Sequence, residues 1–175
     1  LGHTRSDGKT FKDVIGANLA LVVNRARPFA DDPALPAQKK TKLISLKNTV
    51  PVGDWRDSDL GIAFGRYPFD VNAGLVPGAL EAAQTLYTRL GDIPNANEAA
   101  FVLGQWQNVD ELFRIEDDLA TVKANVTSYA MAVGITDTSG QMQSTESAAG
   151  RYSSYGISLD ATGTPMPIMH TDHGF

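Results

Sequence analysis

The chain of 175 residues contains no cysteine. This absence excludes a disulfide framework, a thiolate nucleophile and any metal site that is built on cysteine. It leaves the cellular compartment open. The tripeptide Asn125-Val126-Thr127 fits the acceptor pattern for N-glycosylation. This pattern favours an exported or periplasmic protein.

Positive charge and long apolar runs are also scarce. There are 15 Lys and Arg against 20 Asp and Glu, which gives a formal net charge of -5. A protein that binds nucleic acid or an anionic membrane needs a basic surface, which this composition does not supply. The longest apolar run, Leu19–Val23, is far shorter than the roughly 18 residues of a membrane span. We therefore expect neither nucleic acid nor membrane as a partner.

Several familiar catalytic motifs are missing. No Gly-rich phosphate loop follows a strand pattern and no Gly-x-Ser-x-Gly sequence occurs, so nucleotide chemistry and serine hydrolysis have no support. His170 and His173 flank Asp172 without a further ligand nearby, which favours a polar role for His170 in lining a pocket over a zinc site. Asp137–Gly140 resembles a turn more than a calcium loop. We predict no metal and no cofactor.

Apolar spacing predicts a first helix near the start of the chain. From Thr10, a candidate N-cap, apolar residues recur at every third or fourth position until residues 25–27. Pro28 follows, so we expect the helix to end there. The basic residues between positions 39 and 47 are then expected to form a solvated loop.

A second helix is predicted to begin at Asp70 or Asn72 and to end at Gly91, because glycine is a common C-terminal stop. Pro77 lies inside the apolar pattern. It predicts either a kink or a helix that starts only a residue or two before the proline.

The remaining patterns complete a mainly helical prediction. A third helix is expected over 97–107, with Trp106 in the core, and a fourth from Glu116 to Val133, closed by Gly134. Short strands are expected over 112–115, 155–159 and 166–169, the last two as a hairpin. The length fits about one domain, which we assign to residues 1–175.

Chemistry is concentrated in residues 51–75, PVGDWRDSDLGIAFGRYPFDVNAGL. Three carboxylates, Asp54, Asp57 and Asp59, lie beside Trp55 and Arg56. Carboxylates near an aromatic ring suit glycoside hydrolysis, because one carboxyl group can stay protonated and donate to the leaving oxygen. The competing interpretation is a loop held together by ion pairs between the arginines and the aspartates, followed by an N-cap residue. The residues alone do not decide between the two.

This segment resembles the acid-bearing segment of six-hairpin glycosidases. These are (α/α)6-barrel enzymes that include trehalases, relatives of processing α-glucosidase I, and amylo-1,6-glucosidases. The first half of the likeness is Trp55, Asp57 and Ser58, and the second half is the string Asp70-Val71-Asn72 at the start of a helix.

The resemblance implies a mainly α fold in which helical hairpins form part of an (α/α)6 toroid. It also implies hydrolysis of α-linked glycosides by inversion, with Asp57 as the general acid. Trp55 and Arg56 would contact the sugar, and Asp70 and Asn72 would anchor the loop. The full set of candidate substrate-binding residues is Trp55, Arg56, Asp59, Arg66, Tyr67, Asp70, Asn72 and His170.

The sequence departs from the family pattern in two respects. Arg56 separates Trp55 from Asp57, which keeps Asp54 and Asp59 as reserve candidates for the acid. The family's base comes from a much later segment, and six hairpins need roughly 300 residues or more. The opening at Leu1 without methionine also suggests a piece of a longer protein.

Two later glutamates are candidates for the missing base. Glu116, at a predicted helix start, and Glu146, in a Ser/Thr/Gly-rich loop, fit a capping or solvated role better than a catalytic one. We therefore expect the base to lie on another chain or segment that completes the barrel. The alternative function is a carbohydrate-binding or structural helical module without catalysis, in which the same loop binds sugar or merely clasps the fold.

Overall fold

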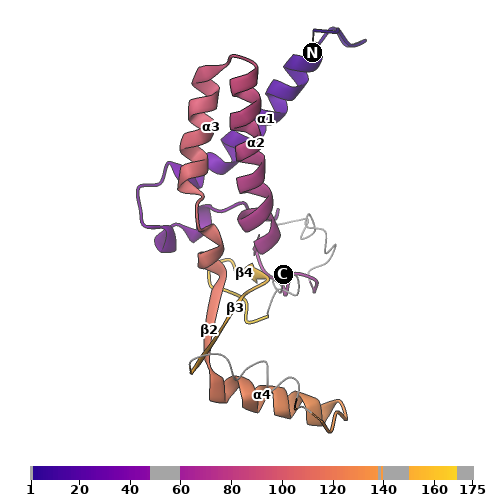
Figure 1. Cartoon of the computed structure of the whole chain (residues 1–175), viewed down its shortest axis with the longest axis vertical. Helices are drawn as coiled ribbons and strands as arrows, with labels where there is room; N and C mark the ends of the chain where they lie inside the picture. The colour runs from indigo at the N-terminus through magenta and orange to yellow at the C-terminus, as the bar shows by residue number, and fades with distance from the viewer. Residues whose placement is uncertain (1, 48–59, 138, 140–149, 169–175) are drawn as a thin grey trace.

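The computed structural model describes residues 2–47, 60–137, 139 and 150–168. It confirms a mainly helical chain with a few short strands. Three long helices stand together at one end, and a two-stranded ribbon leads from them to a fourth helix at the opposite end (Figure 1).

Helix α1 spans Phe11–Ala30 and begins as predicted. Thr10 Oγ1 accepts a hydrogen bond from the Asp13 N–H at 3.2 Å, and Asp13 Oδ2 accepts one from the Thr10 N–H at 2.8 Å. This reciprocal capping box satisfies two of the N–H groups that a helix start leaves open. The Thr10 hydroxyl also donates to Asp13 Oδ2 at 2.7 Å, and this bond, followed by the one from the Thr10 N–H, lowers the pKa of the Asp13 carboxyl.

The predicted end of α1 before Pro28 is wrong. The helix passes through the proline to Ala30. Pro28 gives up one backbone hydrogen bond, but the next turn is held by burial, since Phe29 is fully buried and its ring centroid lies 5.0 Å from that of Trp106. The Trp106 indole N–H donates to Ala26 O at 3.0 Å. Packing in the core therefore carries α1 past a residue that would end an isolated helix.

Helices α2 (Val76–Arg89) and α3 (Ile93–Gln105) form a hairpin against which α1 packs. A π-helical turn, η3 (Asp70–Leu75), runs directly into α2, and Pro77 lies in the first turn of α2. Gly91, at φ +74°, ends the hairpin's first arm as predicted. The predicted start of α3 at residue 97 is late, because Asp92 caps the helix.

The core lies between these three helices. Trp106 is only 1% exposed, which confirms it as a core residue. The buried hydrophobic residues of α1, α2 and α3 are Leu19, Val23, Ala26, Phe29, Ala30, Leu80, Ala83, Tyr87, Ala96, Ala99 and Val102.

Beyond α3 the chain turns through η4 (Val109–Phe113) into strand β2 (Arg114–Asp118), which pairs antiparallel with β3 (Arg151–Tyr155). The predicted helix start at Glu116 is therefore wrong. Pairing with β3 extends the strand to Asp118, and Asp118 then caps α4 (Leu119–Ala132) by accepting a hydrogen bond from the Thr121 N–H at 2.9 Å.

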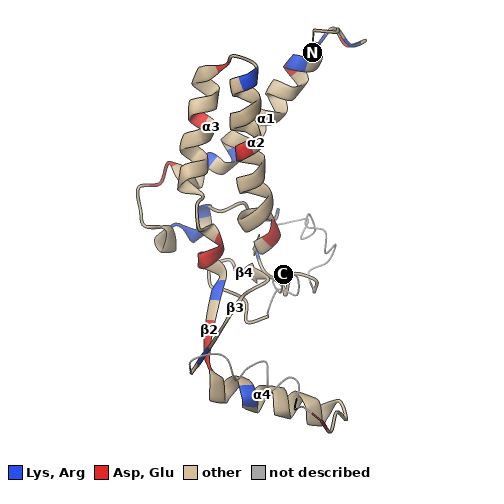
Figure 2. Cartoon of the chain, in the orientation of Figure 1, with Lys and Arg blue, Asp and Glu red and all other residues tan. Residues whose placement is uncertain are grey.

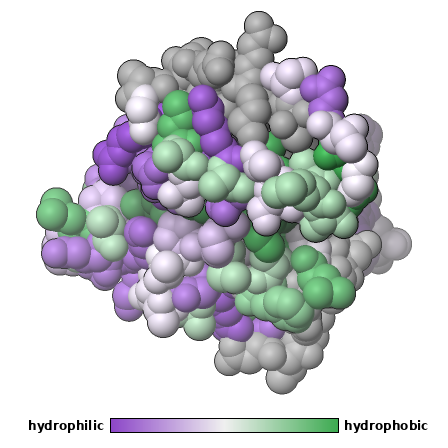
Figure 3. All heavy atoms as spheres, turned by 90° about the horizontal axis from the view of Figure 1, so that it is seen from below, coloured by the Kyte–Doolittle hydropathy of each residue, from purple (hydrophilic) through white to green (hydrophobic). Residues whose placement is uncertain are grey.

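Helix α4 makes few contacts with the other described residues. It touches β2 and β3, and within it only Ala130 is buried. Lys123 is its single charged residue (Figure 2). Large apolar side chains here and just beyond it are exposed, including Tyr129 at 69% and Met131 at 70%. The view from below accordingly shows hydrophobic residues gathered on the surface (Figure 3).

The predicted hairpin of 155–159 and 166–169 is present in part. The Met166 N–H donates to Ser158 O and the Ile157 N–H donates to Ile168 O, both at 2.9 Å. However, the regular strands formed here pair elsewhere, because β3 pairs with β2 and β4 (Ser158–Leu159) pairs with β1 (Tyr67–Pro68). The short 3-10 helices η1 (Pro36–Gln38) and η2 (Lys40–Lys42) complete the fold.

Candidate functional site

The second half of the segment 51–75 is attached to the core by strand β1 (Tyr67–Pro68). Tyr67 pairs with Leu159 and Pro68 with Ser158. Two further backbone hydrogen bonds extend this pairing, from the Arg66 N–H to Leu159 O at 2.6 Å and from the Phe69 N–H to Ile157 O at 3.0 Å. The chain from 66 to 69 thus lies along a segment that is about ninety residues away in the sequence.

Gly65 permits this close approach. A Cβ atom at this position would lie 1.8 Å from Ser158 Oγ and 2.4 Å from Ser158 Cβ. The Ser158 hydroxyl is buried and donates to Ile62 O at 2.7 Å. Residues 62–65 and Ser158 therefore form one interlocked unit just after the stretch that carries the aspartates.

Gly65→Ala is expected to destabilise the chain by about 1–3 kcal/mol, because the added methyl group overlaps Ser158. Urea unfolding would measure the loss, and Ser158→Gly in the same chain should restore part of it. The matched control is Gly78→Ala on α2, which has open space around its Cβ position and should gain about 0.5–1 kcal/mol. A Gly65→Ala variant as stable as the parent would contradict the interlock.

Asn72 is the buried polar centre of this region. Its side chain is 0% exposed and sits in the π-helical turn η3. Asn72 Oδ1 accepts from the Ile44 N–H at 2.8 Å, and Nδ2 donates to Ile44 O at 3.0 Å and to Pro68 O at 2.8 Å. The amide thus pairs with both backbone groups of Ile44, as a neighbouring strand would. This geometry makes Asn72 an anchor and leaves it no surface to present to a ligand.

Tyr67 is likewise committed to the interior. It is 7% exposed, and its hydroxyl donates to Thr41 O at 3.2 Å. The Leu46 N–H donates to Arg66 O at 2.9 Å. The described residues before and after 48–59 are therefore hydrogen-bonded to each other.

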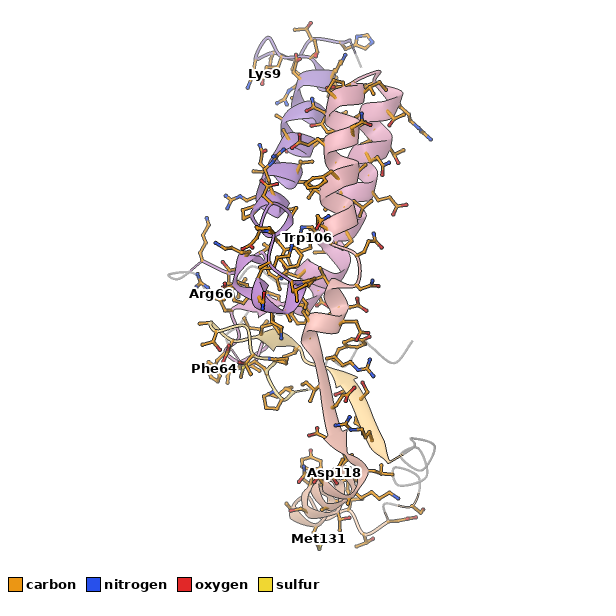
Figure 4. All side chains as sticks on the ribbon, turned by 90° about the vertical axis from the view of Figure 1, so that its left-hand side faces the viewer. Lys9, Phe64, Arg66, Trp106, Asp118 and Met131 are labelled. Atoms are coloured by element: carbon orange, nitrogen blue, oxygen red, sulfur yellow. The ribbon has the colours of Figure 1, made fainter. Side chains whose placement is uncertain are left out.

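The other candidate residues fall into two groups. Arg66 and Asp70 are half-buried on either side of β1. Figure 4 shows Arg66 and Phe64 at the outer edge of the molecule, near the lower end of the three long helices. Trp106 lies in the interior. Outside the described residues lie Asp54, Trp55, Arg56, Asp57, Asp59, Glu146, His170, Asp172 and His173.

A network of charged residues that the sequence analysis did not single out adjoins this region. The Tyr155 hydroxyl donates to Glu111 Oε1 at 3.1 Å, and Arg114 Nη1 donates to Glu111 Oε2 at 3.1 Å. The Tyr155 ring centroid lies 5.6 Å from that of Phe69, the residue between β1 and Asp70. The spacing of Glu111 and Arg114 on one turn was the available signal, but Tyr155 joins them only through the fold.

These contacts set the protonation of the network. The hydrogen bonds from Arg114 and then Tyr155 lower the pKa of the Glu111 carboxyl, so Glu111 is ionised at neutral pH. Burial, together with the bond to Glu111, raises the pKa of the Tyr155 hydroxyl, which keeps it protonated. Glu116 belongs to the same surface, pairing with Arg114 at 3.2 Å and Arg151 at 3.1 Å, and it is a strand residue instead of a helix cap.

The described part of the chain contains no group of three or more His, Asp or Glu side chains that could hold a metal ion. Within the same residues, no helix is long and apolar enough to cross a membrane. Comparison of the chain with protein-family models, with curated proteins and with solved structures gives no match.

Proposed function

We propose that this chain is part of a glycoside hydrolase that cleaves α-linked glycosides by inversion, with Asp57 as the general acid. The proposal rests on the resemblance of residues 53–73 to the acid-bearing segment of six-hairpin glycosidases. Its main structural support is Asn72, whose buried amide joins the helix start to Ile44. A loop that carries a catalytic acid needs such fixed attachment, because catalysis depends on holding the reacting groups in place.

The chemistry assigns a separate role to each group. Asp57 donates its proton to the glycosidic oxygen, so its pKa must be raised by burial near Trp55 or by a neighbouring carboxylate, against the effect of Arg56. A second carboxylate, about 6.5–9.5 Å away, activates the water that attacks from the opposite face. We propose that this base, like the remaining hairpins of the toroid, comes from another chain or segment.

The exposure of α4 supports completion of the fold by a partner segment. Tyr129, Met131, Val133 and Ile135 are between 45% and 70% exposed in and just beyond this helix. An isolated helix of 14 residues is marginal in water and is normally stabilised by packing. Neighbouring hairpins of a toroid would cover these side chains.

The test is hydrolysis of an α-glucosidic oligosaccharide by the intact protein, with the released sugar followed by proton NMR. Inversion releases the β-anomer first, before mutarotation mixes the two forms. Initial release of the α-anomer would contradict inversion. Binding of the oligosaccharide without any hydrolysis would favour the alternative, a carbohydrate-binding module without catalysis.

A further inference from the structure

We infer that a groove between α1 and α3 binds a neutral oligosaccharide. Its larger part is a hollow of about 670 Å³ lined by the end of α1, the loop at 31–36 and two residues of α3, Phe101 and Gln105. In Figure 1 this loop swings out beside the lower half of α3. The volume is in the range of small-molecule sites.

A second hollow continues the groove along the helices. It has about 260 Å³ and is lined by residues that include Asn24, Asn95 and Glu98. Arg27 lines both hollows and therefore marks where they meet. Two adjoining hollows along the helices suit a chain-like ligand better than a compact one.

The two cations among the described lining residues, Arg27 and Lys39, are already engaged within the protein. Arg27 pairs with Glu98 and also with Asp31, at 3.6 Å. Lys39 is 3% exposed, and its ammonium group donates to Asp32 O at 3.0 Å and lies 4.5 Å from the centroid of the Phe29 ring. Within the described lining, neither cation is thus left to attract a phosphate or a sulfate, and these residues favour an uncharged ligand.

The remaining lining groups suit a sugar. Phe101 is 52% exposed, and Gln105 follows it one turn later on the same face of α3. A pyranose ring has an apolar C–H face, which can lie on an exposed aromatic ring, and a rim of hydroxyls. Amide and carboxylate side chains such as Gln105, Asn24 and Asp31 offer the donors and acceptors that these hydroxyls need. The groove therefore has both parts of a saccharide-binding surface.

The test measures binding of neutral oligosaccharides, including maltoheptaose, first on an array and then by calorimetry with the tightest one. Phe101→Ala and Gln105→Ala are each expected to weaken binding by about tenfold. Phe11→Ala is the matched control, because Phe11 is 51% exposed at the start of α1 and lies outside the groove. All three side chains are exposed, so melting temperatures should stay close to the parent's.

Three results would overturn the inference: no binding to any neutral oligosaccharide, binding that Phe101→Ala leaves unchanged, or binding only to sulfated glycans. The inference is independent of the hydrolysis proposed above. Asp57→Asn should leave binding in the groove intact, and Phe101→Ala should leave hydrolysis of a small aryl α-glucoside unchanged, so failure of one proposal is distinguishable from failure of the other.

Discussion

Asp57→Asn in the intact protein is expected to lower kcat on α-linked oligosaccharides by about 10²–10⁴-fold, the usual contribution of a general acid. Asparagine keeps the size of the side chain but has no acidic proton to give to the leaving oxygen. Asp54→Asn and Asp59→Asn are the matched controls, since each removes one carboxylate from the same stretch. We expect both to retain kcat within about tenfold of the parent.

The leaving group separates loss of the acid from general damage to the site. In α-glucosyl fluoride the leaving group is fluoride, which needs little protonation. Asp57→Asn should therefore keep a much larger share of the parent's activity on this substrate than on an oligosaccharide. A variant that loses both substrates equally would point to a disturbed site. An Asp57→Asn variant with nearly full oligosaccharide activity would remove Asp57 from the role of acid, and a large loss in a control variant would move that role to Asp54 or Asp59.

Asn72→Ala is expected to reduce the free energy of unfolding by about 3–5 kcal/mol. The substitution leaves three backbone groups without their partner in a buried position, namely the N–H and C=O of Ile44 and the C=O of Pro68. Each unsatisfied buried group costs about 1–3 kcal/mol, and the sum is reduced where water can enter. For a chain of this size the melting temperature should fall by about 10 °C.

The control for this prediction is Asn125→Ala on α4. Asn125 is exposed, and alanine is a better helix former, so this change should stay within about 0.5 kcal/mol of the parent. Urea unfolding of both variants measures the difference directly. A loss below about 1 kcal/mol for Asn72→Ala would show that the bonds to Ile44 do not carry the attachment of this segment.

The sequence indicated which residues of the candidate site lie near one another along the chain, but not which distant residues they contact. The string Asp70-Val71-Asn72 marked the start of a helical element, because a residue pattern of this kind is local. The partner of Asn72 is Ile44, 28 positions away, and no local signal identifies it. The interlock of Gly65 with Ser158 and the bond between Tyr155 and Glu111 were missed for the same reason.

Features that depend on neighbouring residues could be predicted without the fold. Thr10 and Asp13 cap α1, Pro77 falls in the first turn of α2, and Gly91 ends its arm of the hairpin. Each follows from backbone groups within one turn of the residue concerned.

Features that depend on distant partners could be seen only in the folded chain. Burial of Phe29 against Trp106 carries α1 through Pro28, and pairing with β3 keeps Glu116 in a strand. The groove beside Phe101 likewise exists only because the loop after α1 lies against α3. In each case packing or strand pairing between residues far apart in the sequence outweighs a local preference of about 1–3 kcal/mol. Such contacts depend on the fold as a whole.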